Sequence, residues 1–160
     1  MEIKHKDITY TKYESIDEMP ADLRALLTHA ETAAKLAYAP YSEFFVGAAV
    51  RLANGKVVTG SNRENSSFPA GICAERTALA TAGHQYPGVA VEAMAITVYS
   101  EKYEAFEALP PCGVCRQVMN ETEKHQDNPM EVVFSGMKGT AIRVLGMHNL
   151  LPFSFNLKAR

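Results

Sequence analysis

The first clear pattern of apolar positions in this chain has the spacing of a helix. Between positions 20 and 39, leucines and alanines recur three and four residues apart, so that they share one helical face. Pro20 suits the first turn of a helix, and Pro40 cannot continue one because it lacks a backbone N–H. The pattern therefore predicts a helix from about Pro20 to Ala39.

The next two apolar segments predict a β-hairpin. Residues 44–53 are rich in β-formers and small apolar residues, and a second such run covers residues 56–60. The two runs are separated by Asn54-Gly55, and an Asn-Gly pair in this position is the strongest short-range signal for a hairpin. We expect two antiparallel strands joined by a tight turn.

The remaining pattern alternates between helices and strands. In chain order it predicts an irregular polar stretch (61–71), a helix (72–83), a buried strand (91–99), a helix (114–124) and two short strands (131–135 and 141–144). This order is typical of an α/β fold in which helices pack on a mixed sheet. We expect one domain over residues 1–160, with residues 1–18 as a weakly patterned N-terminal extension.

Composition agrees with a single globular domain. Of the 160 residues, 47% are hydrophobic and 21% are charged, which gives enough apolar area for a core and argues against disorder. The longest apolar run, residues 44–50, is too short to cross a bilayer. The N-terminus lacks the apolar stretch of a signal peptide. We therefore expect a cytoplasmic protein that has no membrane partner.

Charge argues against a nucleic-acid partner. Sixteen Lys and Arg against eighteen Asp and Glu give a formal net charge of −2. Proteins that bind phosphate backbones usually carry a basic excess. The charge balance therefore gives no sign of a nucleic-acid partner.

The candidate chemistry lies in three cysteines. Cys112 and Cys115 are three residues apart, so a helical turn would direct both sulfurs to one side. Cys73 lies at the predicted start of another helix, where the positive end of the helix dipole favours a thiolate. An odd number of cysteines cannot pair fully as disulfides within the chain. Zinc is the metal ion that three converging sulfurs would be expected to bind.

Three protein ligands would leave one position of a tetrahedral zinc site open, which is typical of catalytic zinc. Water in that position loses a proton near neutral pH. Glu75 lies two residues after Cys73, close enough to reach the water without binding the metal. Its carboxylate could take the proton and pass it to a substrate nitrogen.

Two alternatives compete with this interpretation. A Cys-x-x-Cys pair alone also fits core thiols or a redox pair. A structural zinc site would need a fourth ligand, for which the candidates are His84, His125 and His148, although their spacing matches no zinc-finger pattern. Cys-Ala-Glu together with Pro-Cys-x-x-Cys, each opening a helix, matches the signature of zinc-dependent base deaminases. We therefore favour catalytic zinc over structural zinc, and structural zinc over inert thiols.

Beyond this spacing, the chain resembles the small homotetrameric cytidine deaminases from about Leu26 to Phe155. Three segments carry the resemblance: AYAPYSEFFVGAA at 37–49, NREN leading through FPAGI to CAERT at 62–77, and PCGVCRQ at 111–117. Leu150-Leu151-Pro152, followed by Phe155, is similar to the C-terminal signature of the family.

The resemblance implies an activity and an architecture. The activity is hydrolytic deamination of cytidine and 2′-deoxycytidine to uridine and 2′-deoxyuridine plus ammonia, as in pyrimidine salvage. The architecture is a three-layer αβα sandwich with a five-stranded mixed sheet, assembled as a homotetramer with one zinc ion per subunit.

The resemblance also implies a role for individual residues. It makes Cys73, Cys112 and Cys115 the zinc ligands and Glu75 the proton shuttle. For substrate binding it implies that Asn62 and Glu64 hold the ribose 3′-hydroxyl, Phe44 packs on the pyrimidine, the Ala74 N–H holds the base carbonyl oxygen, and Phe155 reaches a neighbouring subunit's site. Taken singly, these side chains would be read as ordinary core, turn or tail residues.

Three thiolates around Zn²⁺ carry an excess negative charge, which would hold a water proton tightly. Arg76 could draw charge from the sulfurs by hydrogen bonding to a thiolate. Arg116 is the alternative candidate for the same role. The chain departs from the usual family pattern at Phe68, where many relatives carry Tyr, and at Arg63, where an apolar residue is common. The segment 101–109 is longer than in compact relatives.

Two other functions remain open at this point. A related deaminase could act on another cytosine nucleoside, such as the antibiotic blasticidin S, although Asn62 and Glu64 favour ordinary nucleosides. A non-catalytic, zinc-stabilised binding domain would have no need of Glu75.

Overall fold

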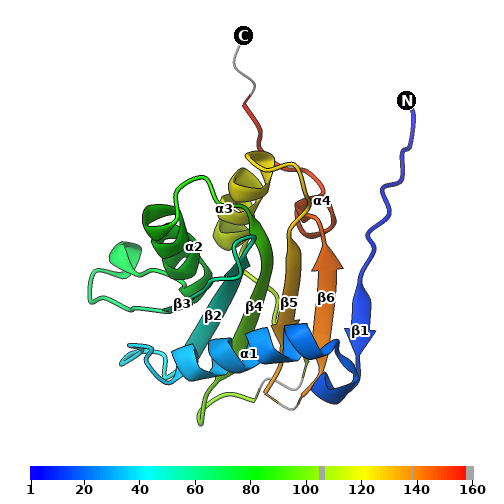
Figure 1. Cartoon of the computed structure of the whole chain (residues 1–160). Helices are drawn as coiled ribbons and strands as arrows, with labels where there is room; N and C mark the ends of the chain where they lie inside the picture. The colour runs from blue at the N-terminus through cyan, green and yellow to red at the C-terminus, as the bar shows by residue number, and fades with distance from the viewer. Residues whose placement is uncertain (105–106, 138, 158–160) are drawn as a thin grey trace.

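In the computed structural model, which describes residues 1–104, 107–137 and 139–157, helices pack on both faces of one sheet (Figure 1). The elements in chain order are β1 (Thr11–Tyr13), the 3₁₀ helix η1 (Ile16–Glu18), α1 (Ala21–Ala34), β2 (Phe45–Leu52), β3 (Val57–Ser61), the 3₁₀ helix η2 (Phe68–Ala70), α2 (Ala74–Gln85), β4 (Val91–Tyr99), α3 (Gly113–Lys124), β5 (Glu131–Ser135), β6 (Ala141–Leu145) and α4 (Met147–Leu150). No helix in this part of the chain has the length and apolar character that a membrane crossing needs.

The sheet has six strands in the order β1-β6-β5-β4-β2-β3. β4 and β5 pair in parallel, with α3 in the connection between them, and the other neighbours pair antiparallel. The predicted α/β fold with a mixed sheet is therefore confirmed. The predicted hairpin is present as well, and Gly55 in its turn has a φ of +79°.

The expected count of five strands is wrong, because β1 adds a sixth strand at the edge. Thr11 pairs with Arg143, and Tyr13 pairs with Ala141 of β6. This strand is only three residues long and mostly exposed, so it carries no alternation of apolar and polar positions. Its backbone pairing with β6, which the sequence pattern does not show, makes it part of the sheet.

The first helix is shorter than predicted. It ends at Ala34 rather than Ala39, and the Lys35 N–H caps the Ala33 carbonyl. The chain then turns so that Tyr38 lies beside residues 62–64: its N–H donates to the Asn62 carbonyl at 3.0 Å, and its own carbonyl accepts from the Glu64 N–H at 2.8 Å. This pairing with a distant segment ends the helix before its apolar pattern does.

The two faces of the sheet carry separate apolar clusters. On one face, α1 packs against alternate residues of the central strands (Leu23, Leu26, Leu27 and Ala30 against Ala49, Ala93, Ala95 and Val133). The opposite face packs against α2, α3 and α4 through the intervening strand positions (among them Val50, Met94, Ile96 and Val132). The predicted three layers therefore follow from the period-two alternation of buried residues on both sides of each central strand.

Two glycines in the hairpin let helices approach the sheet closely. A Cβ at Gly47 would lie 1.9 Å from the Ala30 carbonyl oxygen of α1. A Cβ at Gly60 of β3 would lie 2.4 Å from the Ala78 nitrogen and 2.6 Å from the Ala74 oxygen of α2. Because α2 rests directly on the β3 backbone at Gly60, the sheet fixes where this helix begins.

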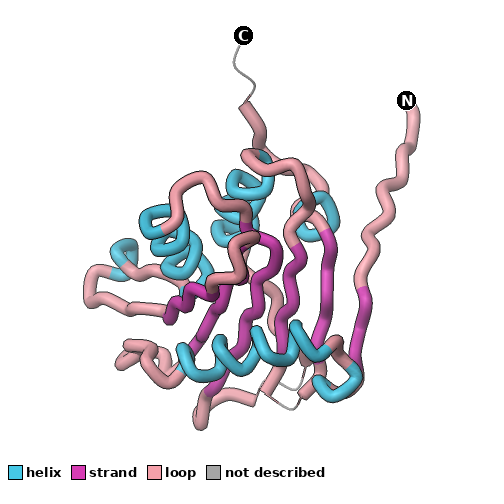
Figure 2. Tube along the Cα trace, in the orientation of Figure 1, coloured by secondary structure: helices cyan, strands magenta, loops and turns pink. Residues whose placement is uncertain are grey.

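The connection from β3 to α2 is long and irregular. It contains only the short η2 helix, and Figure 2 shows it as a loop at one edge of the molecule. Arg63 forms isolated bridges to Tyr38 and to Ile72, so this loop is held by backbone pairing at both ends. The sequence predicts an irregular stretch at 61–71, and the structure agrees.

Candidate metal centre and substrate cavity

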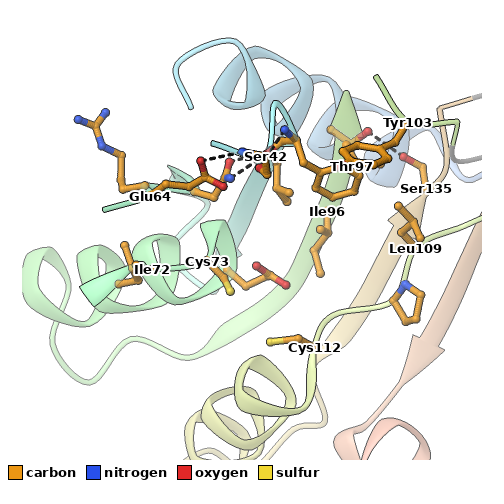
Figure 3. Close-up of a pocket in the computed structure, with 18 of the residues that line it drawn as sticks. Ser42, Glu64, Ile72, Cys73, Ile96, Thr97, Tyr103, Leu109, Cys112 and Ser135 are labelled. Atoms are coloured by element: carbon orange, nitrogen blue, oxygen red, sulfur yellow. Dashed lines mark hydrogen bonds between the residues drawn. The ribbon is translucent and has the colours of Figure 1, made fainter. Parts of the chain in front are cut away.

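The three cysteine sulfurs converge from the starts of two helices. Cys73 is the N-cap of α2, Cys112 is the N-cap of α3, and Cys115 lies in the first turn of α3. The three Sγ atoms lie within 4.8 Å of one another, and those of Cys112 and Cys115 are 3.5 Å apart. Figure 3 shows Cys73 and Cys112 facing the same space from the ends of their helices.

This spacing fits a tetrahedral metal ion. Sulfurs bound to one zinc ion at about 2.3 Å lie about 3.8 Å from one another. Burial ranges from Cys115, which is fully buried, to Cys112, which is exposed. The metal position therefore lies at the boundary between the core and an open cavity, as a site that exchanges ligands requires.

None of the three histidines considered as a fourth ligand belongs to this cluster among the residues that the structure describes. His84 lies in the last turn of α2, at the opposite end of the helix from Cys73. His125 contacts Glu121 at 3.0 Å, and His148 contacts Asn149 at 3.0 Å. The geometry therefore favours three protein ligands over a four-ligand structural site.

The surroundings of the sulfurs favour a thiolate at Cys73. Hydrogen bonds with Cys115, Arg76 and Cys112 lower the pKa of Cys73 to about 5, against the opposing effect of burial. The hydrogen bond with Cys73, together with burial, raises the pKa of Cys115. Negative charge therefore concentrates on Cys73, whose backbone caps the positive end of α2.

The two candidate arginines have different partners. Burial by itself lowers the pKa of Arg76, but its hydrogen bond and charge interaction with Cys73 raise it. Arg76 also donates from Nη2 to the Gly71 carbonyl at 3.2 Å, and its buried Nε has no hydrogen-bond partner among the described residues. Arg116 instead donates to the Pro111 carbonyl at 2.8 Å and the Leu150 carbonyl at 3.0 Å. Arg76 is thus the arginine whose charge acts on the Cys73 sulfur.

Glu75 is a buried carboxyl beside the cluster. It lies in the first turn of α2 with 5% of its surface exposed. Burial, assisted by the charge of Cys73, raises the pKa of Glu75. A carboxyl with a raised pKa exchanges protons more readily near neutral pH than an ordinary glutamate does.

A cavity of about 760 Å³ opens in front of the cluster. It brings together most of the predicted site residues, since its lining includes Phe44, Asn62, Glu64, Cys73, Glu75 and Cys112. Ala74 and Cys115 are fully buried behind this surface. Phe155 is not among the described residues that line it: this side chain is 68% exposed, and its carbonyl accepts a hydrogen bond from Gln117.

The side chains of Asn62 and Glu64 hold the loop that carries Phe44. Asn62 accepts from the Val46 N–H at 2.8 Å and donates to the Phe44 carbonyl at 2.9 Å. Glu64 accepts from the Tyr41 N–H at 2.9 Å. It also accepts from the Ser42 N–H at 3.2 Å (Figure 3). Although burial by itself raises the pKa of Glu64, its hydrogen bonds with Ser42 and Tyr41 lower it. Glu64 is therefore a carboxylate at the cavity wall.

Phe68 and Arg63, which the resemblance singled out, both lie at the cavity. Phe68 contacts Tyr41 edge-on, with ring centroids 5.9 Å apart. Arg63 places its guanidinium 5.3 Å from the centre of the Tyr38 ring. These residues extend the wall without contacting the sulfurs.

Sequence reasoning missed part of the lining. Thr97 and Ser135, from neighbouring strands, share a hydrogen bond of 2.9 Å at the cavity wall. Tyr103, Glu104 and Leu109 line it from the segment 101–109, of which residues 105–106 lie outside the described residues. No local pattern marks them, because their place at the cavity depends on contacts with segments distant in the chain.

Comparison with known proteins places this arrangement in a family. The sequence profile described as the cytidine and deoxycytidylate deaminase zinc-binding region matches residues 20–128. The chain belongs to this family. The match spans both helix starts that carry the cysteines and the loop that carries Asn62 and Glu64.

Individual relatives agree with the family match. A cytidine deaminase from Halalkalibacterium halodurans is 43% identical over 100 residues, covering 62% of this chain and 71% of that protein. A cytidine deaminase from Sporosarcina psychrophila is 35% identical over 136 residues, covering 84% and 92%. The crystal structure of a cytidine deaminase from Burkholderia pseudomallei, 41% identical, aligns with a TM-score of 0.71 over 86% of this chain and all of that one.

The family and the sulfur cluster together establish zinc as the cofactor. Tetrahedral spacing, three converging thiols and an adjacent arginine are what a zinc ion needs from this chain. Cys73, Cys112 and Cys115 would hold the ion, and the cavity would give small molecules access to it.

We predict that Cys112→Ala weakens zinc binding by more than the roughly 10- to 100-fold that loss of a supporting residue costs, because it removes a direct ligand. Zinc content after dialysis against a graded chelator series measures the effect. Val114→Ala is the matched control, since Val114 is an exposed neighbour between the two α3 cysteines. Equal zinc retention in the two variants would contradict the three-sulfur site.

Proposed function

We propose that the protein catalyses the hydrolytic deamination of cytidine and 2′-deoxycytidine to uridine and 2′-deoxyuridine, with release of ammonia. The observation that carries this proposal is the shared cavity of the buried Glu75 carboxyl and the sulfur cluster, lined on its other side by Asn62 and Glu64. Family membership and cytidine deaminase relatives support the same reaction. No observation favours blasticidin S or another antibiotic as the substrate.

The chemistry divides between the cofactor and the chain. Zinc held by three sulfurs supplies a Lewis acid that makes water acidic enough to act as a nucleophile near neutral pH. Glu75 takes a proton from the attacking water and delivers it to N3 of the base, which makes C4 electrophilic. Glu75 then moves the remaining hydroxyl proton to the exocyclic amine. The C4–O bond has formed, the C4–N bond breaks, and ammonia leaves.

Other residues would hold the nucleoside in place. Asn62 and Glu64 are proposed to bind the ribose 3′-hydroxyl, and the carboxylate state of Glu64 supports a role as hydrogen-bond acceptor. Phe44 is proposed to pack on the pyrimidine, which agrees with its place in the cavity wall. Ala74 is the first residue of α2, where backbone N–H groups have no partner within the helix, so its N–H could bind the base carbonyl oxygen.

Glu75→Gln should lower kcat for cytidine by about 10²- to 10⁴-fold, because the amide cannot carry a proton between water and substrate. The loss of the cytosine absorbance band measures turnover, and metal analysis of the same sample should show unchanged zinc. Glu92→Gln is the control, since Glu92 is an acid paired with Arg51 on the sheet. An active, zinc-loaded Glu75→Gln protein would remove Glu75 from the mechanism, and inactivity of the wild-type protein would refute the proposed reaction.

Arg76→Ala should depress kcat more than Arg116→Ala does. The charge of Arg76 interacts favourably with the Cys73 thiolate. Losing a residue that supports a metal ligand typically costs about 10- to 100-fold in activity or affinity. Arg116 holds two backbone carbonyls, so its loss affects the position of Pro111 rather than the charge of the sulfurs. Steady-state kinetics on zinc-loaded samples compare the two variants, and the reverse order would refute this assignment.

We further propose that the protein works as a homotetramer in which Phe155 reaches a neighbour's cavity. The high exposure of Phe155, and its position outside its own cavity, support this arrangement. Specific activity should then fall when the protein is diluted below the dissociation constant of the tetramer, in step with dissociation seen by sedimentation. Full activity of a sedimenting monomer would contradict a shared site.

The place of this reaction is proposed to be pyrimidine salvage in the cytoplasm, where three free thiols stay reduced. Expression in a pyrimidine-requiring host fed only cytidine tests this proposal, because growth needs the deaminated product inside the cell. Failure to grow, with active protein present in the cell, would contradict it.

A further inference from the structure

We propose that Tyr103 is a substrate-contacting residue that determines specificity. The rings of Tyr103 and Phe44 together form an aromatic wall of the cavity. In the proposed binding mode, Tyr103 faces the C5–C6 edge of the bound pyrimidine. The inference rests on the proposed function and deepens it, since it assigns a role to the segment between β4 and α3 that the motifs do not cover.

Tyr103 contributes directly to the cavity wall. Its ring meets Phe44 edge-on, with centroids 6.2 Å apart and planes at 69°, a favourable geometry for an aromatic pair. Figure 3 shows Tyr103 near Thr97 and Leu109, on the side of the cavity away from Glu64. The side chain is nonetheless 47% exposed, so a large part of its ring is free to meet a ligand.

A buried serine fixes the position of Tyr103. Ser100 is 4% exposed, and its hydroxyl donates to the Glu43 carbonyl at 2.8 Å. The same oxygen accepts from the Lys102 N–H at 3.1 Å and the Tyr103 N–H at 3.2 Å. A serine hydroxyl offers one donor and two acceptor positions, so Ser100 is fully used in this turn. The backbone of Tyr103 is therefore held by a group inside the protein.

The same serine ties this turn to the loop that carries Phe44. Glu43, which directly precedes Phe44, has a φ of +56°, a left-handed conformation that is costly for a residue with a side chain. The hydrogen bond from Ser100 to the Glu43 carbonyl, and the 3.6 Å ion pair between Lys102 and the Glu43 carboxylate, both stabilise it. Phe44 and Tyr103 are thus placed relative to each other by the Ser100 hydroxyl, which bonds to the backbone on both sides.

The position of the wall indicates which part of the substrate it meets. In the proposed function, C4 and N3 of the base point to the sulfurs and Glu75, and N1 carries the ribose toward Asn62 and Glu64. The base carbonyl oxygen points to the start of α2. The C5–C6 edge remains, and the cavity side formed by Tyr103 and Leu109 remains to face it. Tyr103 should therefore limit the size of a substituent at C5.

The test uses zinc-loaded full-length protein with cytidine and 5-methylcytidine as substrates. Tyr103→Ala should raise KM for cytidine by about 3- to 10-fold through loss of the aromatic contact, and leave kcat within about twofold. It should also raise kcat/KM for 5-methylcytidine relative to cytidine by about 10-fold, since one methyl group in an apolar pocket discriminates on this scale. Tyr103→Phe keeps the ring and should therefore keep the wild-type ratio of kcat/KM between the two substrates.

Two further variants separate contact from general structure. Tyr99→Ala is the matched control. The rings of Tyr99 and Phe45 lie with their centroids 6.1 Å apart, but Tyr99 is not among the described residues that line the cavity. Its loss should therefore leave the ratio of kcat/KM between 5-methylcytidine and cytidine unchanged. Ser100→Ala releases the Tyr103 turn, and it should shift KM and the ratio in the same direction as Tyr103→Ala but by less. A substrate ratio within twofold of wild type in Tyr103→Ala, or a fall in kcat alone, would overturn the proposal.

Binding of the products distinguishes failure of this inference from failure of the proposed function. Calorimetry with uridine and 5-methyluridine requires no turnover. A wild-type protein that binds uridine but does not deaminate cytidine would refute the reaction, while the binding ratio of the two products in Tyr103→Ala would still decide the role of Tyr103. A wild-type protein that neither binds uridine nor deaminates cytidine would refute both.

Discussion

The convergence of two helix N-termini on one point is the constraint on which the rest of the site depends. Three sulfurs within 4.8 Å of one another repel as soon as more than one is ionised, so their position requires compensating positive charge. The N-terminal ends of α2 and α3 supply part of this positive charge, and Arg76 supplies more. A bound zinc ion, as in this zinc-binding family, would supply the largest part. Glu75 has its buried position and raised pKa because it lies in the same helical turn that brings Cys73 to the cluster.

The fold fixes this convergence through backbone contacts rather than long side chains. The absence of a side chain at Gly60 lets α2 rest on β3, while the parallel pairing of β4 and β5 carries α3 across the same face of the sheet. The other wall of the cavity is held differently, since the side chains of Asn62 and Glu64 bond to the backbone of the segment that holds Phe44. Residues expected to contact ribose thus also position the aromatic wall, and changing them would affect both roles.

Much of this could be predicted from the sequence, because periodic burial and motif spacing are local signals. The central strands, α2, α3 and the convergence of the three cysteines follow from them, as does the placement of Glu75 beside the cluster. Strand β1 and the early end of α1 could not be predicted, since each depends on backbone pairing with a distant segment. Tyr103 was missed for a related reason: its position depends on Ser100 and Glu43, which lie 57 residues apart in the chain.

The most direct test of the account is the zinc-edge X-ray absorption spectrum of the purified, catalytically assayed protein. Three sulfur ligands at about 2.3 Å and a single light-atom ligand would support a site with one exchangeable position. The light-atom contribution should change when uridine or cytidine is added, because the cavity opens onto that position. A spectrum showing an imidazole among the ligands, or four sulfurs, and no response to nucleoside would contradict the account.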